Sequence, residues 1–479
     1  MLQEAPQPGC RTGSESVHQS APADNRNEAT GLARFATQLR EMLGAIVRAE
    51  DDRTLAQRTA FIAFFIRASS AALALVSQIL LARWLGSHEY GIFAFAFVTL
   101  VLVGGLIPLG FPTAGQRFIA EYTEAGRPDL TRGYVFGSRL FVVGVGTLVA
   151  VVGAAGLWLF SERIGGDYVL PLYLVLVCLP VYALMEVQDG IARNYSWIDL
   201  ALALPYLVRP LSILAIVGGT ILVTGHADAV TAGYALIAAV WITGMAQLIL
   251  LDIRLGRRLP KGRRSYAWKG WTVTALPIFL VESFYMLLTN TDVLVVSLYM
   301  GPADVGVYYA AVKVLALVSF VPFAVTAASA HKYAEYNTAG DVARLQSFVR
   351  DTVRWTFWPA LLASLAILVA GKPLLWLFGP DFSAGYPLLF ILVIGLMARA
   401  MVGPVDRVLN MLGQQNACAI VYAGAFALNL ALNFTLIPRF GLSGAAWATS
   451  TALIVESILL FFVAKSRLGL HVFVLDSRR

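Results

Sequence analysis

Long apolar segments alternate with short polar connections along the chain, beginning near residue 60. Several of them contain no charged residue at all, for example 229–251 and 408–438. About 20 consecutive apolar residues are enough for one helix to cross a bilayer. We therefore expect an all-α, polytopic membrane protein with twelve transmembrane helices, at 60–82, 90–112, 136–160, 168–186, 201–223, 229–251, 271–298, 304–329, 351–370, 384–405, 418–437 and 443–465.

The distribution of basic residues predicts the orientation of these helices. With the N-terminus in the cytoplasm, the cytoplasmic connections hold 26 Lys and Arg residues, counting Lys465 at the cytoplasmic end of the last span, and the outer connections only 4. Basic residues concentrate in the cytoplasmic loops of membrane proteins. One helix more or fewer would destroy this asymmetry, so the pattern predicts an even number of helices with both termini in the cytoplasm.

Composition supports a membrane protein and excludes a soluble one. Of the 479 residues, 58% are hydrophobic and only 14% are charged, whereas soluble domains carry about 25% charged residues. The cytoplasmic loops account for the net charge of +7, so no nucleic-acid partner is expected. Three cysteines cannot form a disulfide framework.

The same pattern divides the chain into five segments. Within the N-terminal tail, residues 31–50 have one apolar helical face, which suits either an amphipathic helix in the membrane interface or a simple spacer helix. The predicted segments are a cytoplasmic tail (1–58), a first six-helix lobe (59–252), a basic cytoplasmic linker (253–270), a second six-helix lobe (271–467) and a cytoplasmic C-terminal tail (468–479).

The two lobes resemble each other in sequence. Residues 85–93 and 300–308 share the pattern apolar-Gly-x-x-acid-x-Gly-branched-aromatic at an offset of 215 residues, and 158–160 repeats as 376–378. Arg139 and Arg354 match at the same offset as the first pair. Because six is an even number of helices, both halves have the same orientation in the membrane. We therefore expect an internal repeat related by an axis along the membrane normal. The substrate would then pass between the two lobes.

Two segments resemble a known family. Residues 67–91 (RASSAALALVSQILLARWLGSHEYG) and 292–308 (DVLVVSLYMGPADVGVY) are similar to the first hairpin of each half in the Wzx-like bacterial polysaccharide flippases. These proteins belong to the superfamily of multidrug, oligosaccharidyl-lipid and polysaccharide exporters. The resemblance extends over roughly residues 58–470 and implies a V-shaped, MATE-like pair of six-helix lobes.

The resemblance also implies a function. Such proteins move polyprenyl-pyrophosphate-linked oligosaccharide or polysaccharide repeat units across the bacterial inner membrane by alternating access, for exopolysaccharide, capsule or O-antigen (lipopolysaccharide) biosynthesis. The implied partners are the lipid-linked glycan, the bilayer, and polysaccharide polymerase or assembly proteins. No cofactor and no metal site is expected.

Basic residues within the spans are the first candidates for function, because a charge at the bilayer centre costs about 2.5 to 3.5 kcal/mol on insertion scales. A pyrophosphate that leaves water needs charge-assisted donors, which arginine supplies as a bidentate fork. We expect a basic path that binds the substrate, formed by Arg67, Arg209, Lys313 and Arg399. Arg139 and Arg354 are weaker candidates, because they can reach the headgroups from the cytoplasmic edge.

Two helices carry a polar stripe, which needs either a water-filled lumen or a polar partner helix. One stripe runs from Arg67 to Gln78 through Ser70 and Ala74. The other holds Glu282, Tyr285, Thr289 and Asp292, within about 80° of arc. An ion pair between Glu282 and Lys313 is the structural alternative to a lumen.

The acidic residues of the spans are candidates for ion coupling. We expect Glu282 and Asp292 to couple transport to Na⁺ or H⁺, and the choice between the two ions stays open. Carboxylate and amide oxygens suit Na⁺ better than a transition metal. Weaker candidates are Gln78, Asn290, Asn429, Asn433 and Glu456.

No enzyme is expected, because the chain lacks a phosphate-binding glycine loop, HExxH and GxSxG. Two other functions stay open: an ion-coupled multidrug exporter, which holds cations with acidic residues, and a non-transporting scaffold of a polysaccharide assembly complex. The spans contain six basic and three acidic residues, an excess of basic charge that favours an anionic substrate. Glu186 and Asp406 lie at span ends, and counting them reduces this excess to one.

Overall fold

The computed structural model describes residues 52–474, apart from 164 and 339–340. The predicted amphipathic helix at 31–50 and most of the N-terminal tail lie outside these residues. The chain divides into two compact units, Met1–Phe61 and Ile62–Arg479, and the predicted lobes both fall in the second.

The described residues form helices and no strand, which confirms the all-α prediction. The helices of the first half are α2 (Asp52–Leu106), α3 (Phe111–Glu124), α4 (Pro128–Phe160), η1 (Ser161–Arg163), α5 (Gly166–Asn194), η2 (Asp199–Val208), α6 (Arg209–Thr224) and α7 (Ala229–Arg258). Those of the second half are α8 (Trp268–Tyr299), α9 (Pro302–Leu315), α10 (Phe320–Thr338), α11 (Val342–Phe378), η3 (Asp381–Gly385), α12 (Tyr386–Val402), α13 (Val405–Met411), α14 (Gln415–Phe440) and α15 (Leu442–Leu468).

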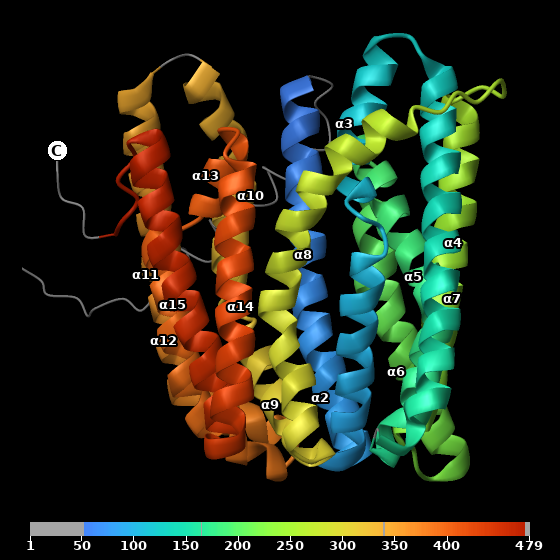
Figure 1. Cartoon of the computed structure of the whole chain (residues 1–479), viewed down its shortest axis with the longest axis vertical. Coiled ribbons are helices and arrows are strands. Elements are labelled where there is room, and N and C mark those ends of the chain that lie inside the picture. The colour runs from blue at the N-terminus through green and yellow to red at the C-terminus, as the bar shows by residue number, and fades with distance from the viewer. Residues whose placement is uncertain (1–51, 164, 339–340, 475–479) are drawn as a thin grey trace, which may run out of the picture. The chain divides into compact units, whose positions relative to one another are not determined.

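Among the described residues, ten segments are long and apolar enough to cross a membrane, or eleven if the bent pair α9 and α10 forms one span. One of the ten, Ser69–Glu124, contains the predicted span 90–112 and part of 60–82. These two spans meet at Gly86, whose backbone (φ 78°, ψ 172°) is not helical. The chain of α2 reverses direction at one end of the bundle (Figure 1). The total of twelve spans stays a prediction.

Two predicted spans contain breaks that the apolar pattern did not reveal. The span at 304–329 is bent by 41° between α9 and α10. The span at 201–223 begins as the π-helix η2 and continues as α6. Pro205 lies inside η2, and because proline has no backbone N–H, the regular α-helical ladder cannot run through that position.

The halves pack through different sets of helices. In the first half, α4 and α7 both contact α5; in the second half, α12 and α14 both contact α15. Figure 1 shows these as the green-to-cyan and the orange-to-red groups. Residues 470–474 of the predicted C-terminal tail also pack into the second half, where Leu470 and Val472 are buried and the Val474 amide donates to the Met401 carbonyl at 3.1 Å.

The end of the bundle near Gly86, which we call the Gly86 end, is held by contacts between the halves. Gly91 lies so close to the Pro302 carbonyl that a Cβ atom there would clash with it, and Gly306 approaches the backbone of Ser87 in the same way. The Ser87 hydroxyl also donates to Asp381 at 3.1 Å. The two copies of the 85–93 pattern therefore meet each other.

Arginine 83 strengthens the Gly86 end. Its guanidinium donates to the carbonyls of Leu377 (2.7 Å) and Trp376 (3.0 Å) at the end of α11, and lies 4.7 Å from the Trp376 ring centroid. The last carbonyls of a helix lack the amide four residues on, and although the Gly379 amide also donates to the Trp376 carbonyl at 3.0 Å, Arg83 adds donors from the other half to the end of α11.

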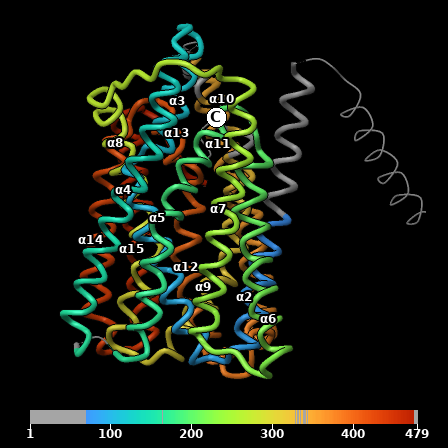
Figure 2. The backbone as a smooth tube through the Cα atoms, turned by 90° about the vertical axis from the view of Figure 1, so that its right-hand side faces the viewer, coloured from blue at the N-terminus to red at the C-terminus, as the bar shows by residue number. Residues whose placement is uncertain are grey.

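The opposite end, which we call the linker end, carries the connection between α7 and α8 (Figures 1 and 2). This basic linker lies on α4, where Arg132 donates to the carbonyls of Pro260 and Arg263, both at 2.8 Å. The Ser265 amide donates to the Asp129 carbonyl at 3.0 Å. These hydrogen bonds fix the linker on α4 of the first half.

Candidate functional site

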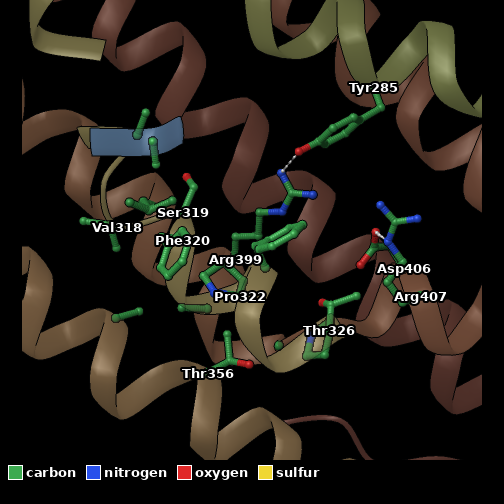
Figure 3. A pocket seen from close by; sticks show the side chains of 18 of the residues that line it. Tyr285, Val318, Ser319, Phe320, Pro322, Thr326, Thr356, Arg399, Asp406 and Arg407 are labelled. Carbon is green, nitrogen blue, oxygen red and sulfur yellow. Dashed lines mark hydrogen bonds and ion pairs between the residues drawn. The ribbon is translucent and has the colours of Figure 1, made fainter. Parts of the chain in front are cut away.

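A large cavity of about 490 Å³ lies between elements of both halves. Tyr285 of α8 and Arg399 of α12 point into it, and Asp406 and Arg407 of α13 lie on another side (Figure 3). Because α13 lies toward the linker end (Figure 1), the cavity lies on the linker side of the Gly86-end contacts.

A small cavity of about 260 Å³ adjoins the large one. Both are lined by Ser70, Ala71, Ala74, Tyr206 and Ala316. The small cavity continues to Leu81 and Phe93, on either side of Gly86 in the sequence. Together the cavities extend from α13 toward the sealed Gly86 end.

Small side chains of α2 leave the space for these cavities. Ser70 and Ala74 lie on the predicted polar stripe and line both cavities, and Gln78 lines the small one. Gln78 also accepts a hydrogen bond from the Tyr90 hydroxyl at 2.9 Å. The side chain of Arg67, the first residue of the stripe, lies outside the described part of the chain.

Two of the predicted cations, one from each half, line the small cavity. Arg209 begins α6, and its guanidinium carbon lies 5.4 Å from the Tyr182 ring centroid. The Lys313 ammonium lies 4.6 Å from the Tyr309 ring centroid on α9. Aromatic faces attract cations without removing their hydrogen-bond donors, so both side chains can still donate to an anion in the cavity.

Arg399, the third predicted cation, lines the large cavity and is partly neutralised. Its guanidinium lies 3.6 Å from the Glu456 carboxylate and donates to the Tyr285 hydroxyl at 3.4 Å. The Arg399 side chain is 24% exposed, whereas that of Glu456 is fully buried. Arg399 therefore faces both a buried anion and the cavity.

Sequence reasoning missed Arg407, a further cation of the large cavity. Its side chain is 55% exposed and lies 3.6 Å from Asp406. Both residues follow the predicted span 384–405, in a connection that was expected to lie outside the membrane. Gly403, with a positive φ of 63°, redirects the chain between α12 and α13, and this turn brings the two side chains to the cavity wall.

The weaker basic candidates do not line either cavity. Arg139 of α4 forms an ion pair with Asp252 of α7 at 2.6 Å, so it joins two helices of the first half. Arg354 is exposed on α11. Neither position contributes to the predicted basic path.

The predicted alternative pairing of Glu282 with Lys313 is wrong. Glu282 instead accepts a hydrogen bond from the Thr113 hydroxyl of α3 at 2.7 Å, and Lys313 lies at the Tyr309 ring. The Asn290 amide donates to the Met286 carbonyl of its own helix at 2.9 Å, and among the described residues no hydrogen bond joins it to Asp292.

Asp292 lies in a buried polar cluster of the second half. Its carboxylate accepts hydrogen bonds from the Tyr308 hydroxyl (2.6 Å), the Thr449 hydroxyl (3.3 Å) and the Val293 amide (2.9 Å). Asn433 donates to Asn429 at 2.9 Å, and Asn429 donates to Thr449 at 3.5 Å. The cluster joins α8, α9, α14 and α15, which the sequence could not place together.

The hydrogen-bond donors of this cluster form a chain that ends at Asp292, and one acceptor at the other end of the chain receives no hydrogen bond from the described part of the protein. The side-chain oxygen of Asn433 is buried and has no hydrogen-bond partner among the described residues. Carboxylate, amide and hydroxyl oxygens are ligands for hard cations, and a buried acceptor without a donor is costly. The cluster is therefore chemically suited to a small cation.

Comparison with curated proteins identifies transport proteins rather than enzymes as relatives. The chain is 24% identical over 385 residues to the probable low-salt glycan biosynthesis flippase Agl15 of Haloferax volcanii, covering 79% of this chain and 77% of that protein. It is 23% identical over 398 residues to a Shigella flexneri protein named for O-antigen transport, covering 79% and 90% of the two chains.

Solved structures share the fold at low sequence identity. The lipid II flippase MurJ, in an inward closed conformation, has a TM-score of 0.68 at 15% identity and covers 85% of this chain and 87% of its own. An inward-facing multidrug resistance transporter of the MATE family has a TM-score of 0.67 at 15% identity, with coverage of 85% and 98%. The predicted MATE-like fold is confirmed.

Two family models match the sequence. The MatE model matches residues 277–435, within the second half. The model described as polysaccharide biosynthesis protein matches residues 57–330, more than half of the chain and across the midpoint. The chain is a multi-pass membrane protein and belongs to the polysaccharide biosynthesis protein family.

Proposed function

We propose that this protein is a flippase, which carries a glycan linked to a polyprenyl pyrophosphate across a membrane. One observation carries the proposal: two adjoining cavities between the halves are lined by Arg209, Lys313, Arg399 and Arg407. The related glycan flippase and O-antigen transporter support this substrate class.

The order of the cations suggests how the pyrophosphate moves. Arg407 and Arg399 line the large cavity, and Arg209 and Lys313 line the small cavity closer to the Gly86 end. Each step offers the phosphates a new charge-assisted donor before the previous one is lost. The cavities then become accessible from the other side when the Gly86-end contacts separate and the linker end closes.

We place the linker end and both termini in the cytoplasm, because the linker carries Arg257, Arg258, Lys261, Arg263, Arg264 and Lys269. The membrane would be the bacterial inner membrane, and the glycan would serve exopolysaccharide, capsule or O-antigen biosynthesis, together with a polymerase or other assembly proteins. Periplasmically active reporters fused at Gly262 would contradict this orientation.

We further propose that the Asp292 cluster binds the coupling cation, and that this cation is Na⁺. Asp292, Asn429, Asn433 and Thr449 supply one carboxylate, two amide oxygens and one hydroxyl from three helices. A bound cation between helices changes the stability of one conformation relative to the other, which is the requirement for coupling. Glu282 is exposed and hydrogen-bonded to Thr113, so it contributes less to this site.

The flippase proposal is tested with purified protein in liposomes of defined lipid. A fluorescent polyprenyl-pyrophosphate sugar is placed in both leaflets, and the outer-leaflet fraction is followed with a membrane-impermeant quencher. Movement beyond that in protein-free liposomes supports the proposal. Absence of lipid translocation together with accumulation of a cationic dye would instead identify a multidrug exporter, the function suggested by the MatE match.

A further inference from the structure

Glu456 of α15 is a buried carboxylate with one cationic neighbour. Its side chain is completely buried, and neither carboxylate oxygen has a hydrogen-bond partner among the described residues. The Arg399 guanidinium, 3.6 Å away, forms an ion pair with it. A buried carboxylate usually needs both a counter-charge and hydrogen bonds, so Glu456 depends on Arg399.

The other ionisable groups around Glu456 do not replace Arg399. The helices packed against α15 are α8, α12, α13 and α14. Besides Arg399 of α12, they contribute the anion Asp406 from α13, and the neutral groups Tyr285 from α8 and Cys418 and Tyr422 from α14. Asp406 repels a negative charge on Glu456, and the neighbouring cation of α13, Arg407, pairs with Asp406 at 3.6 Å. Among these groups, Arg399 is therefore the one that favours the ionised form of Glu456.

The same arginine is exposed to the substrate cavity. Arg399 lines the large cavity and donates to Tyr285, whose side chain is 38% exposed there (Figure 3). A phosphate group in this cavity would compete with the Glu456 carboxylate for the guanidinium. The phosphate approaches from the open side, and the ion pair at 3.6 Å is longer than a bidentate pair.

We propose that Arg399 exchanges Glu456 for a phosphate oxygen when the substrate enters, and that Glu456 then takes up one proton from the water of the cavity. The inference rests on the proposed flippase function and names a second ion-linked site, separate from the Asp292 cluster. When the phosphate leaves, the guanidinium returns to Glu456 and the proton is released.

This exchange keeps the cavity wall electrically balanced. Without proton uptake, substrate binding would leave a buried carboxylate next to Asp406 with no counter-charge, which is strongly unfavourable. With it, the substrate complex crosses the membrane with one negative charge fewer. The proton accompanies the glycan, so this site reduces the charge that is moved and does not by itself use an inward proton gradient.

The test is a calorimetric titration of the purified full-length protein with farnesyl pyrophosphate, at one pH in two buffers of different ionisation enthalpy. The difference between the buffers gives the number of protons taken up per ligand. We expect Glu456→Gln to take up about one proton fewer than the unsubstituted protein. Its affinity should also lose the pH dependence of up to about tenfold per pH unit that one linked proton produces.

Glu121→Gln is the matched control, because this exposed glutamate of α3 pairs with Arg117 and lines neither cavity. It should keep the proton uptake of the unsubstituted protein. Glu456→Asp retains a titratable carboxyl and should retain the uptake as well. Equal proton uptake in Glu456→Gln and the unsubstituted protein would overturn the proposal.

A second measurement needs no substitution at Glu456. Infrared difference spectra of the unsubstituted protein, recorded with and without farnesyl pyrophosphate, should gain the C=O band of a protonated carboxylic acid. Ligand binding without this band would contradict the exchange at Arg399. Absence of any binding would instead contradict the proposed flippase function, so the two failures are distinguishable.

Discussion

Arg209 and Lys313 are the cations of the small cavity, and each comes from a different half. Arg209→Ala or Lys313→Ala should weaken substrate binding by about 1.5 to 3 kcal/mol, the usual contribution of a hydrogen bond to a charged group. This corresponds to roughly a 10- to 150-fold loss of affinity. The initial rate of lipid translocation in liposomes, at substrate concentrations below saturation, measures the loss.

Arg354→Ala provides the arginine control for these variants, since Arg354 lines neither cavity. It should transport at the rate of the unsubstituted protein. If both cavity variants also translocate lipid at that rate, with normal amounts in the membrane, the basic path is not part of the mechanism.

Asp292→Asn retains the size of the side chain but removes its charge from the polar cluster. We expect the variant to lose the dependence of the transport rate on Na⁺, because the carboxylate is the charged ligand of the proposed site. Transport rates at increasing Na⁺, with K⁺ keeping the ionic strength constant, measure this. Asn290→Ala, which changes a residue bonded within its own helix, should keep the Na⁺ dependence. Unchanged dependence in Asp292→Asn would exclude the site.

Candidate residues could be predicted from the sequence where a charged residue lies deep within a predicted span. Arg209, Lys313 and Arg399 were predicted because each lies far from the ends of its span, and all three line cavities. Their partners were not predictable, because periodicity assigns a face to one helix but not the helix opposite it. Arg407 was missed for a related reason: its position depends on the turn at Gly403.

Among the elements, α7 begins with an aspartate cap. The carboxylate of Asp228 accepts hydrogen bonds from the Thr231 amide (2.8 Å) and hydroxyl (2.7 Å). Partial burial raises the pKa of Asp228, but these hydrogen bonds outweigh it, so the pKa is lowered. The ionised cap therefore stabilises the helix at neutral pH, and this stabilisation is lost as the pH falls through the lowered pKa.

Asp228→Ala should reduce the stability of the protein by about 1 kcal/mol at pH 7, the usual contribution of a cap. The difference from the unsubstituted protein should shrink below about pH 4, where the aspartate protonates in the unfolded chain. Thermal unfolding in detergent, at pH 7 and again below about pH 4, measures the loss of stability and its dependence on pH. Asp228→Asn keeps a capping oxygen without the charge, so at neutral pH its loss of stability should lie between those of the unsubstituted protein and Asp228→Ala. An Asp228→Ala deficit independent of pH would contradict the role of the charge.

At the level of helices, the sequence predicted which segments are helical but not how they are broken. Apolar composition sets the length of a span, so the helices were found, and several extend beyond the expected limits, as α11 (Val342–Phe378) does around the predicted 351–370. The apolar pattern contained neither the bend between α9 and α10 nor the π-helix η2. The break at η2 coincides with Pro205, and an apolar pattern alone does not record where the backbone of a span departs from a regular α-helix.

For the molecule as a whole, alternating access requires the contacts at the Gly86 end to separate. The Ser87 hydroxyl and the Asp381 carboxylate are 3.1 Å apart in different halves. In a protein with Cys10, Cys178 and Cys418 replaced by serine, Ser87→Cys and Asp381→Cys together should form a disulfide on oxidation. This disulfide should stop lipid translocation, and reduction should restore it.

Each single cysteine variant, treated with the same oxidant, is the control for this cross-link and should remain active. The fraction cross-linked is read from gel mobility after proteolysis between the halves. Full translocation by completely cross-linked protein would mean that the Gly86 end does not need to open, and that the substrate takes another route.

The contact of Gly91 with Pro302 and of Gly306 with Ser87 joins two copies of one nine-residue pattern. A surface that binds its own copy about an axis is the isologous interface of a symmetric dimer. At this contact, the surface of each half is therefore complementary to the equivalent surface of the other half. A larger side chain at either glycine would have to be accommodated by the opposite copy, so we expect these two positions to vary together among related proteins.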